Sequence, residues 1–390
     1  MSTAERHPLR LAVVRQRYNP YGGAERFIER ALGALVREGA EITLITRNWD
    51  GAPQSGYRQI VCDPPYSRHL GGRAARDRSF AASAQRAMRE GGYDITQAHE
   101  RIPGCMIFRA GDGVHAAWLD HRGRDQSPLA RLATRLSAFH RFILRQEAAM
   151  LAAPELRAVI CNSRMVYDEM RRYYAVPQDN LVVIENGIDL GHFHPGLAAE
   201  WRTRQRQMLN LDADVPVFLY VGGGFARKGV PQIITALARC TSRHGQHSRL
   251  VVVGEDRHLE TYRRQAAKLG LAERVLFVGP QRDVRPFYGM ADAFVLPTRY
   301  DPMPNAALEA LACGLPTLTS PTCGIATRIT DGENGFVVDA LDVDALARHL
   351  DLLAAPGRAD GMRAAARASV ADLDLDLLAG ELLGLYHRLR

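Results

Sequence analysis

Short apolar segments alternate with segments of helical periodicity along the chain, and this alternation constrains the fold more than any other feature. It is typical of α/β domains with parallel sheets, because each helix returns the chain to the start of the next strand. With 390 residues, 46% of them hydrophobic, the chain is long enough for two cores. The predicted strands include 11–14, 42–46, 217–221, 250–254, 275–279 and 293–296.

These strands group into two Rossmann-like domains, predicted at residues 1–190 and 191–372. The first domain ends at an Asn-Gly turn at 186–187, and the arginine-rich stretch 201–207 predicts a linker helix into the second. In such folds ligands bind beyond the carboxyl ends of the strands. We therefore expect the ligand in the cleft between the two domains.

A glycine-rich segment follows the predicted strand 217–221. Three glycines at 222–224 precede two cations, Arg227 and Lys228, and then a helix. Glycines let the backbone approach an anion, the helix start presents N–H groups, and the cations neutralise its charge. The segment predicts a diphosphate site, although it lacks the ending of a P-loop. Lysine is otherwise represented in the whole chain only by Lys268.

Two carboxylates flank the start of the helix predicted after strand 293–296. Asp301 lies in the preceding loop, and Glu309 lies within the apolar helix. A carboxylate on an apolar segment needs a partner or a ligand to offset its desolvation. A ribose diol can donate to both carboxylate oxygens, as in dinucleotide-binding folds. The alternative, that Glu309 caps a neighbouring turn or pairs with an arginine, stays open.

Together these motifs resemble those of glycosyltransferase family 4, retaining enzymes with the GT-B fold of two Rossmann-like domains facing across a cleft. The resemblance runs from Gly22 to Gly335. It is most similar to the lipopolysaccharide core glucosyltransferase I subgroup, on the segments 18–23, 46–51, 102–104, 224–229 and 322–324. It implies that the amphipathic segment 373–390 is a helix that crosses back to the first domain.

The resemblance assigns roles on the donor side. Asp301 and Glu309 match the family's two acids, so that Glu309 binds the donor ribose and Asp301, usually a glutamate in the family, lies near the transferred sugar. Arg227 and Lys228 match the cations that hold the diphosphate. The remaining donor-side residues are Gly223, where many members have arginine, Gly279, Gln281 and Arg282 at the loop that contacts the base, and Asn305 at the helix start.

On the acceptor side, the resemblance places Gly22 and Gly23 in a glycine loop close to the diphosphate and the acceptor. Asp112 and His115 follow a strand end and correspond loosely to residues that contact the donor hexose. His99 is the rival for that contact. A plain tight turn at the glycines and a structural role for either histidine are the alternatives.

No metal or cofactor site is predicted. No Asp-x-Asp motif follows a strand, and the acids around 342–344 suit the start of a helix. GT-B enzymes generally need no metal, and the cations with helix dipoles would stabilise the diphosphate. The six cysteines lack metal spacing and suit buried free thiols in a reducing cytoplasm. No secretory signal and no apolar stretch that could span a bilayer is visible.

The net charge of +7 suggests an acidic partner, and the segment 121–150 is a candidate for the surface that binds it. Leucines and other apolar residues recur there at helical spacing between arginines at 131, 135, 141 and 145. This pattern predicts a basic amphipathic helix on an anionic membrane, and the same place in the resembled subgroup interacts with membranes. The alternative is a core helix with solvated arginines.

The resemblance implies a metal-independent hexosyltransferase whose donor is a nucleotide sugar, expected to be UDP-glucose. Its acceptor would be a lipid-linked glycan, an inner-core heptose of lipopolysaccharide, on the cytoplasmic face of the bacterial inner membrane. A basic nucleic-acid-binding protein is one alternative, because abundant arginine permits phosphate contacts. No nucleic-acid recognition motif supports it. A sugar-nucleotide epimerase on the same fold is the other.

Overall fold

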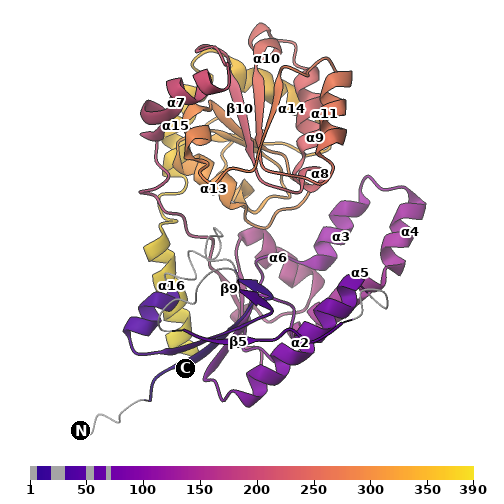
Figure 1. The fold of residues 1–390 in the computed structure, drawn as a ribbon, viewed down its shortest axis with the longest axis vertical. Helices are drawn as coiled ribbons and strands as arrows, with labels where there is room; N and C mark the ends of the chain where they lie inside the picture. The colour runs from indigo at the N-terminus through magenta and orange to yellow at the C-terminus, as the bar shows by residue number, and fades with distance from the viewer. Residues whose placement is uncertain (1–6, 19–30, 50–56, 67–71) are drawn as a thin grey trace. The chain divides into compact units, whose positions relative to one another are not determined.

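The computed structural model describes residues 7–18, 31–49, 57–66 and 72–390. The chain divides into two compact units, 1–187 together with 375–390, and 188–374 (Figure 1). The sequence had placed the domain boundaries after residues 190 and 372. Gly22 and Gly23 lie outside the described residues.

The first unit is built on a seven-stranded parallel sheet in the order β5-β3-β1-β6-β7-β8-β9. Every residue of β6, β7 and β8 is buried, as expected for parallel strands covered by helices on both faces. The strands are β1 Arg10–Val14, β3 Glu41–Thr46, β5 Tyr57–Val61, β6 Ile95–Ala98, β7 Ile107–Arg109, β8 Ala158–Cys161 and β9 Leu181–Val183, with a separate pair, β2 Arg17–Tyr18 and β4 Asn48–Trp49. The named helices are α2 Gly72–Glu90, α3 His115–Gly123, α4 Pro128–Leu136, α5 Ala138–Leu151, α6 Arg164–Tyr173 and the short η1 Gln178–Asn180.

The second unit has a six-stranded parallel sheet in the order β12-β11-β10-β13-β14-β15. Its strands are β10 Val217–Val221, β11 Arg249–Val253, β12 Val275–Gly279, β13 Ala293–Leu296, β14 Thr317–Thr319 and β15 Gly335–Val337. Its helices are α7 Leu197–Met208, α8 Phe225–Lys228, α9 Val230–Ala238, α10 Arg243–His247, α11 Leu259–Lys268, α12 Arg285–Met290, α13 Asn305–Ala312, η2 Gly324–Arg328, α14 Val343–Ala354 and α15 Arg358–Ala368. The chain runs outward from β10 to β11 and β12, then returns to β13 on the other side. The strand order therefore reverses between β10 and β13, the position where doubly wound folds bind ligands.

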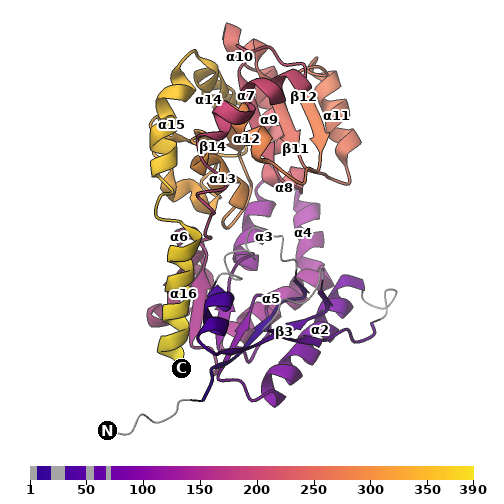
Figure 2. The ribbon, with the colours of Figure 1, turned by 60° about the vertical axis from the view of Figure 1, so that its left-hand side comes forward.

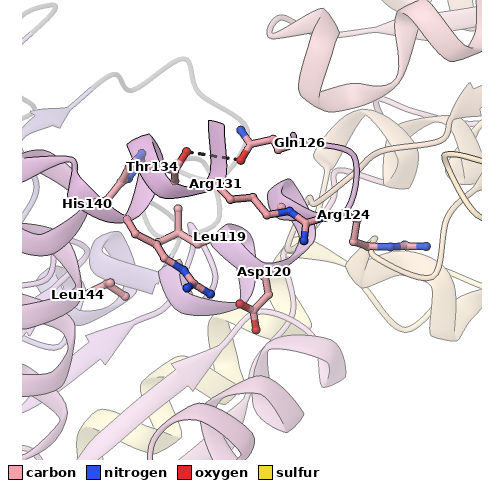
Figure 3. Close-up of a pocket in the computed structure, with 10 residues that line it drawn as sticks. Leu119, Asp120, Arg124, Gln126, Arg131, Thr134, His140 and Leu144 are labelled. Atoms are coloured by element: carbon pink, nitrogen blue, oxygen red, sulfur yellow. Dashed lines mark hydrogen bonds between the residues drawn. The ribbon is translucent and has the colours of Figure 1, made fainter. Parts of the chain in front are cut away.

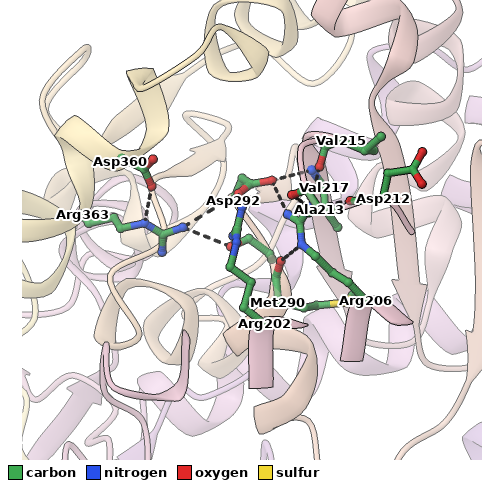
Figure 4. A network of polar contacts seen from close by, with 11 residues as sticks. Arg202, Arg206, Asp212, Ala213, Val215, Val217, Met290, Asp292, Asp360 and Arg363 are labelled. Carbon is green, nitrogen blue, oxygen red and sulfur yellow. Dashed lines mark hydrogen bonds and ion pairs between the residues drawn. The ribbon is translucent and has the colours of Figure 1, made fainter. Parts of the chain in front are cut away.

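A buried arginine fixes helix α7, the predicted linker helix, to this sheet (Figure 4). Arg206 is 2% exposed and donates Nη2 to Asp292 Oδ2 at 2.8 Å. The same carboxylate oxygen accepts the backbone N–H of Val217, the first residue of β10, at 2.7 Å. The other Arg206 nitrogens donate to the carbonyls of Asp212, Ala213, Val215 and Met290. Helix α7 is therefore fixed to the second unit, because the guanidinium nitrogens of Arg206 donate to backbone carbonyls and to the Asp292 carboxylate.

The terminal helix α16, Leu375–Leu389, belongs to the first unit (Figures 1 and 2). Tyr386 is fully buried and donates its hydroxyl to Gln97 Oε1 of β6 at 2.9 Å. The sequence prediction of a helix that returns to the first domain is confirmed. All six cysteines are free and all but Cys62 are buried, as their apolar surroundings indicated.

Candidate functional site

The glycine segment after β10 lies where two backbone strands approach closely. Gly229 has φ of 87°, and a Cβ there would lie 2.1 Å from the carbonyl oxygen of Pro297 at the end of β13. A Cβ at Gly254, after β11, would likewise lie 2.1 Å from the carbonyl oxygen of Gly222. Only glycine fits both positions. The backbones that follow β10, β11 and β13 therefore lie close together, next to the segment that carries the two cations.

Arg227 and Lys228 form the end of the short helix α8, whose first residue Phe225 is buried. The loop after β13 holds this end, since the backbone N–H of Arg299 donates to the carbonyl of Arg227 at 2.8 Å. The Arg227 guanidinium in turn donates to the carbonyl of Tyr300. Arg227 is therefore fixed by the backbone of the loop that carries Asp301.

Asp301 faces both cations. Its Oδ2 lies 3.1 Å from Lys228 Nζ and 3.5 Å from Arg227 Nη1. That oxygen is buried and, besides these ion pairs, has no hydrogen-bond partner. Its backbone is fixed by Thr322 and Gly324, which accept and donate at 3.1 and 2.8 Å. The structure thus brings three of the predicted residues into one charged cluster at the ends of β10 and β13.

Glu309 lies on α13, which begins just after Pro304 with no side-chain cap on its first N–H groups. The Glu309 carboxylate accepts a hydrogen bond at 2.8 Å from the hydroxyl of Tyr288, a buried residue of α12. The same hydroxyl lies 3.1 Å from the carbonyl oxygen of Ala306. Burial and the neighbouring Glu309 raise the pKa of Tyr288 well above its usual value, so it stays protonated and donates. Asn305 is the first residue of the same helix.

Tyr288 was not predicted from the sequence. The signal available was a tyrosine in the short apolar run Phe287–Met290, where a hydroxyl needs a partner once buried. The sequence could not identify Glu309 as that partner, because 21 residues separate the two. We regard Tyr288 as a positioning residue for the carboxylate.

The three residues predicted at the base-contacting loop lie at the end of β12. Gly279 is its last residue and has φ of 73°. Gln281 and Arg282 are exposed, and Gln281 Nε2 donates to the carbonyl of Val278 at 2.9 Å. Gly223 is also exposed, in the glycine segment after β10. These residues follow the carboxyl ends of strands in the same parallel sheet as Asp301.

In the first unit, His115 is the first residue of α3 and Asp112 lies exposed in the preceding turn. The His115 backbone N–H donates to the fully buried carboxylate of Glu147, at 3.1 and 3.0 Å to its two oxygens. Its Nε2 lies 3.1 Å from Nδ1 of His140. Burial and then Arg101 lower the pKa of His115 to about 4. The imidazole is therefore neutral at pH 7 and suits hydrogen bonds to hydroxyl groups.

Glu147 has two further donors, which the sequence did not reveal. Arg101 Nε donates to it at 2.7 Å, and the hydroxyl of Tyr174 donates at 2.7 Å. The Arg101 guanidinium also donates to the carbonyl of Gly113 at 2.8 Å. The turn that carries Asp112 and His115 is thus fixed by a charged network beneath it.

His99, the rival histidine, follows β6. Its Nδ1 lies 3.2 Å from Arg15 Nη1 and its Nε2 lies 2.9 Å from Gln97 Nε2. Burial, with Arg15 and Arg109 nearby, lowers its pKa well below the usual value. His99 is therefore also neutral, with both ring nitrogens contacted by side chains.

The single amphipathic helix predicted in 121–150 is wrong, because the chain breaks at Ser137 into α4 and α5. Ser137 caps the start of α5 with its hydroxyl, and Ser127 does the same for α4. Hydroxyl caps satisfy the N–H groups that a helix start leaves unpaired. No helix of the described residues is long and apolar enough to cross a membrane. Helix α4 has no buried residue, whereas α5 buries Glu147 and Met150.

Comparison with known proteins gives two family matches. The profile described as Glycosyltransferase Family 4 matches residues 21–192, and the profile described as Glycosyl transferases group 1 matches residues 202–368. The chain is 25% identical over 322 residues to lipopolysaccharide glucosyltransferase WaaG of Escherichia coli K12, covering 83% of each chain. It is 29% identical over 369 residues to a GDP-mannose-dependent α-(1-6)-phosphatidylinositol monomannoside mannosyltransferase of Mycolicibacterium smegmatis, covering 89% of each.

Solved structures agree on the fold. The crystal structure of WaaG superposes with a TM-score of 0.80 at 22% identity, over 96% of this chain and 99% of that one. Anabaena HepE in complex with UDP-glucose superposes with a TM-score of 0.71 at 19% identity, over 97% and 100%. At these identities the likeness establishes the architecture of two α/β units.

Proposed function

Because the chain belongs to glycosyltransferase family 4 and has the GT-B fold, we propose that it transfers glucose from UDP-glucose to an inner-core heptose of lipopolysaccharide. The proposal includes retention of anomeric configuration and independence of metal ions. Membership of the family sets aside the nucleic-acid-binding and epimerase alternatives.

The observation that carries the proposal is the cluster of Lys228, Arg227 and Asp301. Two cations paired with Asp301, which lies in the loop that leads to a helix start without a side-chain cap, are suited to a diphosphate. Ion pairing and oriented N–H groups would act on the same charge. Lys228 and Arg227 would stabilise the charge that grows as the diphosphate leaves. Asp301 would orient the cations and lie near the transferred sugar.

Glu309 and Tyr288 support a ribose contact on the same helix. The Tyr288 hydroxyl donates to one carboxylate oxygen, which orients the Glu309 carboxylate. Gly279, Gln281 and Arg282 would contact the base. In the first unit, the neutral imidazole of His115 and the exposed Asp112 would contact hexose hydroxyls. We place the acceptor on this unit.

The reaction would proceed on one face of the sugar, with the leaving diphosphate helping to deprotonate the acceptor hydroxyl. The two cations support this route, since they would act on charge on the leaving oxygen without a protein nucleophile. The similarity to WaaG supports a lipopolysaccharide acceptor. A lipid-linked acceptor and the basic α4–α5 segment support peripheral association with the cytoplasmic face of the inner membrane.

The donor is tested by calorimetric titration with UDP-, GDP- and ADP-sugars, followed by transfer of radiolabelled sugar to heptose-terminated lipopolysaccharide. We expect UDP-glucose to bind most tightly and transfer to proceed equally with and without EDTA. Selective binding of GDP-mannose would instead favour the chemistry of the mycobacterial relative. Loss of transfer with EDTA, restored by Mg²⁺, would contradict metal independence.

A further inference from the structure

His115 and His140 form a pair of imidazoles that meet through one nitrogen of each ring. His115 Nε2 lies 3.1 Å from His140 Nδ1, and the ring of Phe139 lies edge-on to both imidazoles. Burial is the main cause that lowers the pKa of each histidine, so both rings are neutral at pH 7. Between two neutral rings in contact, only one of the two facing nitrogens carries the hydrogen that is donated.

Arg122, on α3, decides which nitrogen carries that hydrogen. Its Nη1 lies 3.3 Å from His140 Nε2. A guanidinium group only donates, so His140 Nε2 accepts and carries no hydrogen. In the neutral ring the hydrogen is then on Nδ1, which donates to His115 Nε2. Because this Nε2 accepts, His115 carries its own hydrogen on Nδ1.

The surroundings of His140 show why the contact with Arg122 is needed. His140 lines a pocket of about 400 Å³ between α3, α4 and α5, together with Leu119 and Leu144 (Figure 3). Water in such a pocket can hydrogen-bond to a neutral imidazole in either tautomer, so the pocket alone selects neither. The guanidinium group, which only donates, removes this choice.

Helix α5 holds His115 at two points. The backbone N–H of His115 donates to the Glu147 carboxylate, and its ring meets His140. His140 and Glu147 are seven residues apart, about two turns, and so share one face of α5. Within the described part of the chain, His115 Nδ1 has no hydrogen-bond partner, and it is not among the buried polar atoms that lack one. This nitrogen is therefore accessible to a ligand.

We propose that Arg122 and His140 are positioning residues that hold His115 as the Nδ1–H tautomer, which donates to an oxygen of the transferred sugar. The inference rests on the proposed contact between His115 and the hexose, and it adds the direction of that hydrogen bond. Arg122 sets the tautomer of His140, and His140 sets that of His115. Without Arg122 both rings can reverse, and His115 Nδ1 then accepts a hydrogen bond where it otherwise donates one.

The tautomers are measured directly by long-range ¹H–¹⁵N correlation NMR of protein labelled with ¹⁵N-histidine. The chain has 13 histidines, and the spectra of His115→Gln and His140→Gln identify the two signals. We expect Nδ1–H for both histidines in the wild type. Arg122→Leu should let both rings populate Nε2–H. Arg122→Lys keeps a group that only donates and should retain the wild-type tautomers.

Arg171→Leu is the matched control, because it removes the same charge from an exposed position of α6. It should leave the tautomers and the kinetics unchanged. With a soluble acceptor fragment, Arg122→Leu should raise KM for the nucleotide sugar roughly tenfold, as expected for one hydrogen bond, with kcat little changed. Binding of the free nucleotide diphosphate should not change, since it lacks the hexose. Circular dichroism checks folding.

Nε2–H at His115 in the wild type, or unchanged tautomers in Arg122→Leu, would overturn the inference. A tautomer change with an unchanged KM for the nucleotide sugar would overturn the donation to the sugar. Equal weakening of nucleotide sugar and free nucleotide would overturn it as well, because the effect would then not concern the hexose. A wild-type protein that transfers no sugar would instead contradict the proposed function, and the NMR spectra would still decide the tautomers.

Discussion

Replacing Lys228 with alanine tests the diphosphate site most directly. Lys228 Nζ lies 3.1 Å from Asp301 Oδ2, and its side chain is 16% exposed. At an effective dielectric constant of about 20, a cation about 4 Å from a unit of developing charge contributes about 4 kcal/mol. Partial exposure and the remaining Arg227 reduce this to about 2.7 kcal/mol, which is roughly 100-fold in kcat.

The same change should affect folding much less. Arg227 Nη1, 3.5 Å from Asp301 Oδ2, still compensates the carboxylate after the lysine is lost. We therefore expect the free energy of unfolding to fall by only about 1–2 kcal/mol. Urea titration measures this change, and the steady-state release of nucleotide diphosphate in the presence of acceptor measures kcat.

Lys268 provides a matched control, because it is the other lysine of the chain and is exposed at the end of α11. Lys268→Ala should leave kcat and the donor KM unchanged. A folded Lys228→Ala enzyme with kcat within about threefold of the wild type would refute the assignment of Lys228 to the leaving group.

Three further predictions concern neighbouring parts of the structure. Glu309→Gln should weaken donor binding by about 1.5–3 kcal/mol, measured by calorimetry with UDP, and unchanged binding would make Glu309 structural. Tyr288→Phe keeps the ring but removes the donor at 2.8 Å, so donor KM should rise roughly tenfold with kcat little changed; a fall in kcat at unchanged KM would contradict a positioning role. His115 is neutral in the fold down to about pH 4, whereas in the unfolded chain it binds a proton below about 6.5. Stability should therefore decrease as pH falls from about 6.5 to 4, by up to about 2 kcal/mol after solvent screening, and His115→Gln should flatten that slope in urea titrations at a series of pH values.

Much of the strand framework could be predicted from the sequence. The predicted strands 217–221, 275–279 and 293–296 coincide with β10, β12 and β13, and 11–14 and 42–46 differ from β1 and β3 by one residue. Such strands can be predicted from the sequence because a buried parallel strand is a short run of apolar residues. This run can be recognised without knowing which strands pair with it. The glycines and prolines around α8 and α13 could likewise be interpreted from neighbouring residues alone.

The helix break at Ser137 could not be predicted from the spacing of apolar residues. Apolar residues on both sides keep a helical spacing, and only the competition between a continuous helix and a hydroxyl cap decides where the chain turns. Helix α5 buries Glu147 and Met150 against the rest of the first unit, whereas α4 buries no residue, so the two halves of the segment differ in packing. The spacing of apolar residues along the sequence gives no information about that packing.

The same distinction between local pattern and tertiary packing applies to the candidate site. The sequence by itself determined which residues carry the charges, and that each lies in a loop or helix that follows a strand. These residues are Arg227, Lys228, Asp301 and Glu309. Only the tertiary structure decided that Asp301 meets Lys228, 73 residues away, and that Tyr288 donates to Glu309. The physical reason is that local patterns reflect forces between neighbours in the chain. Which side chains meet across strands depends on strand order, and that order is fixed by burying both faces of the whole sheet at once.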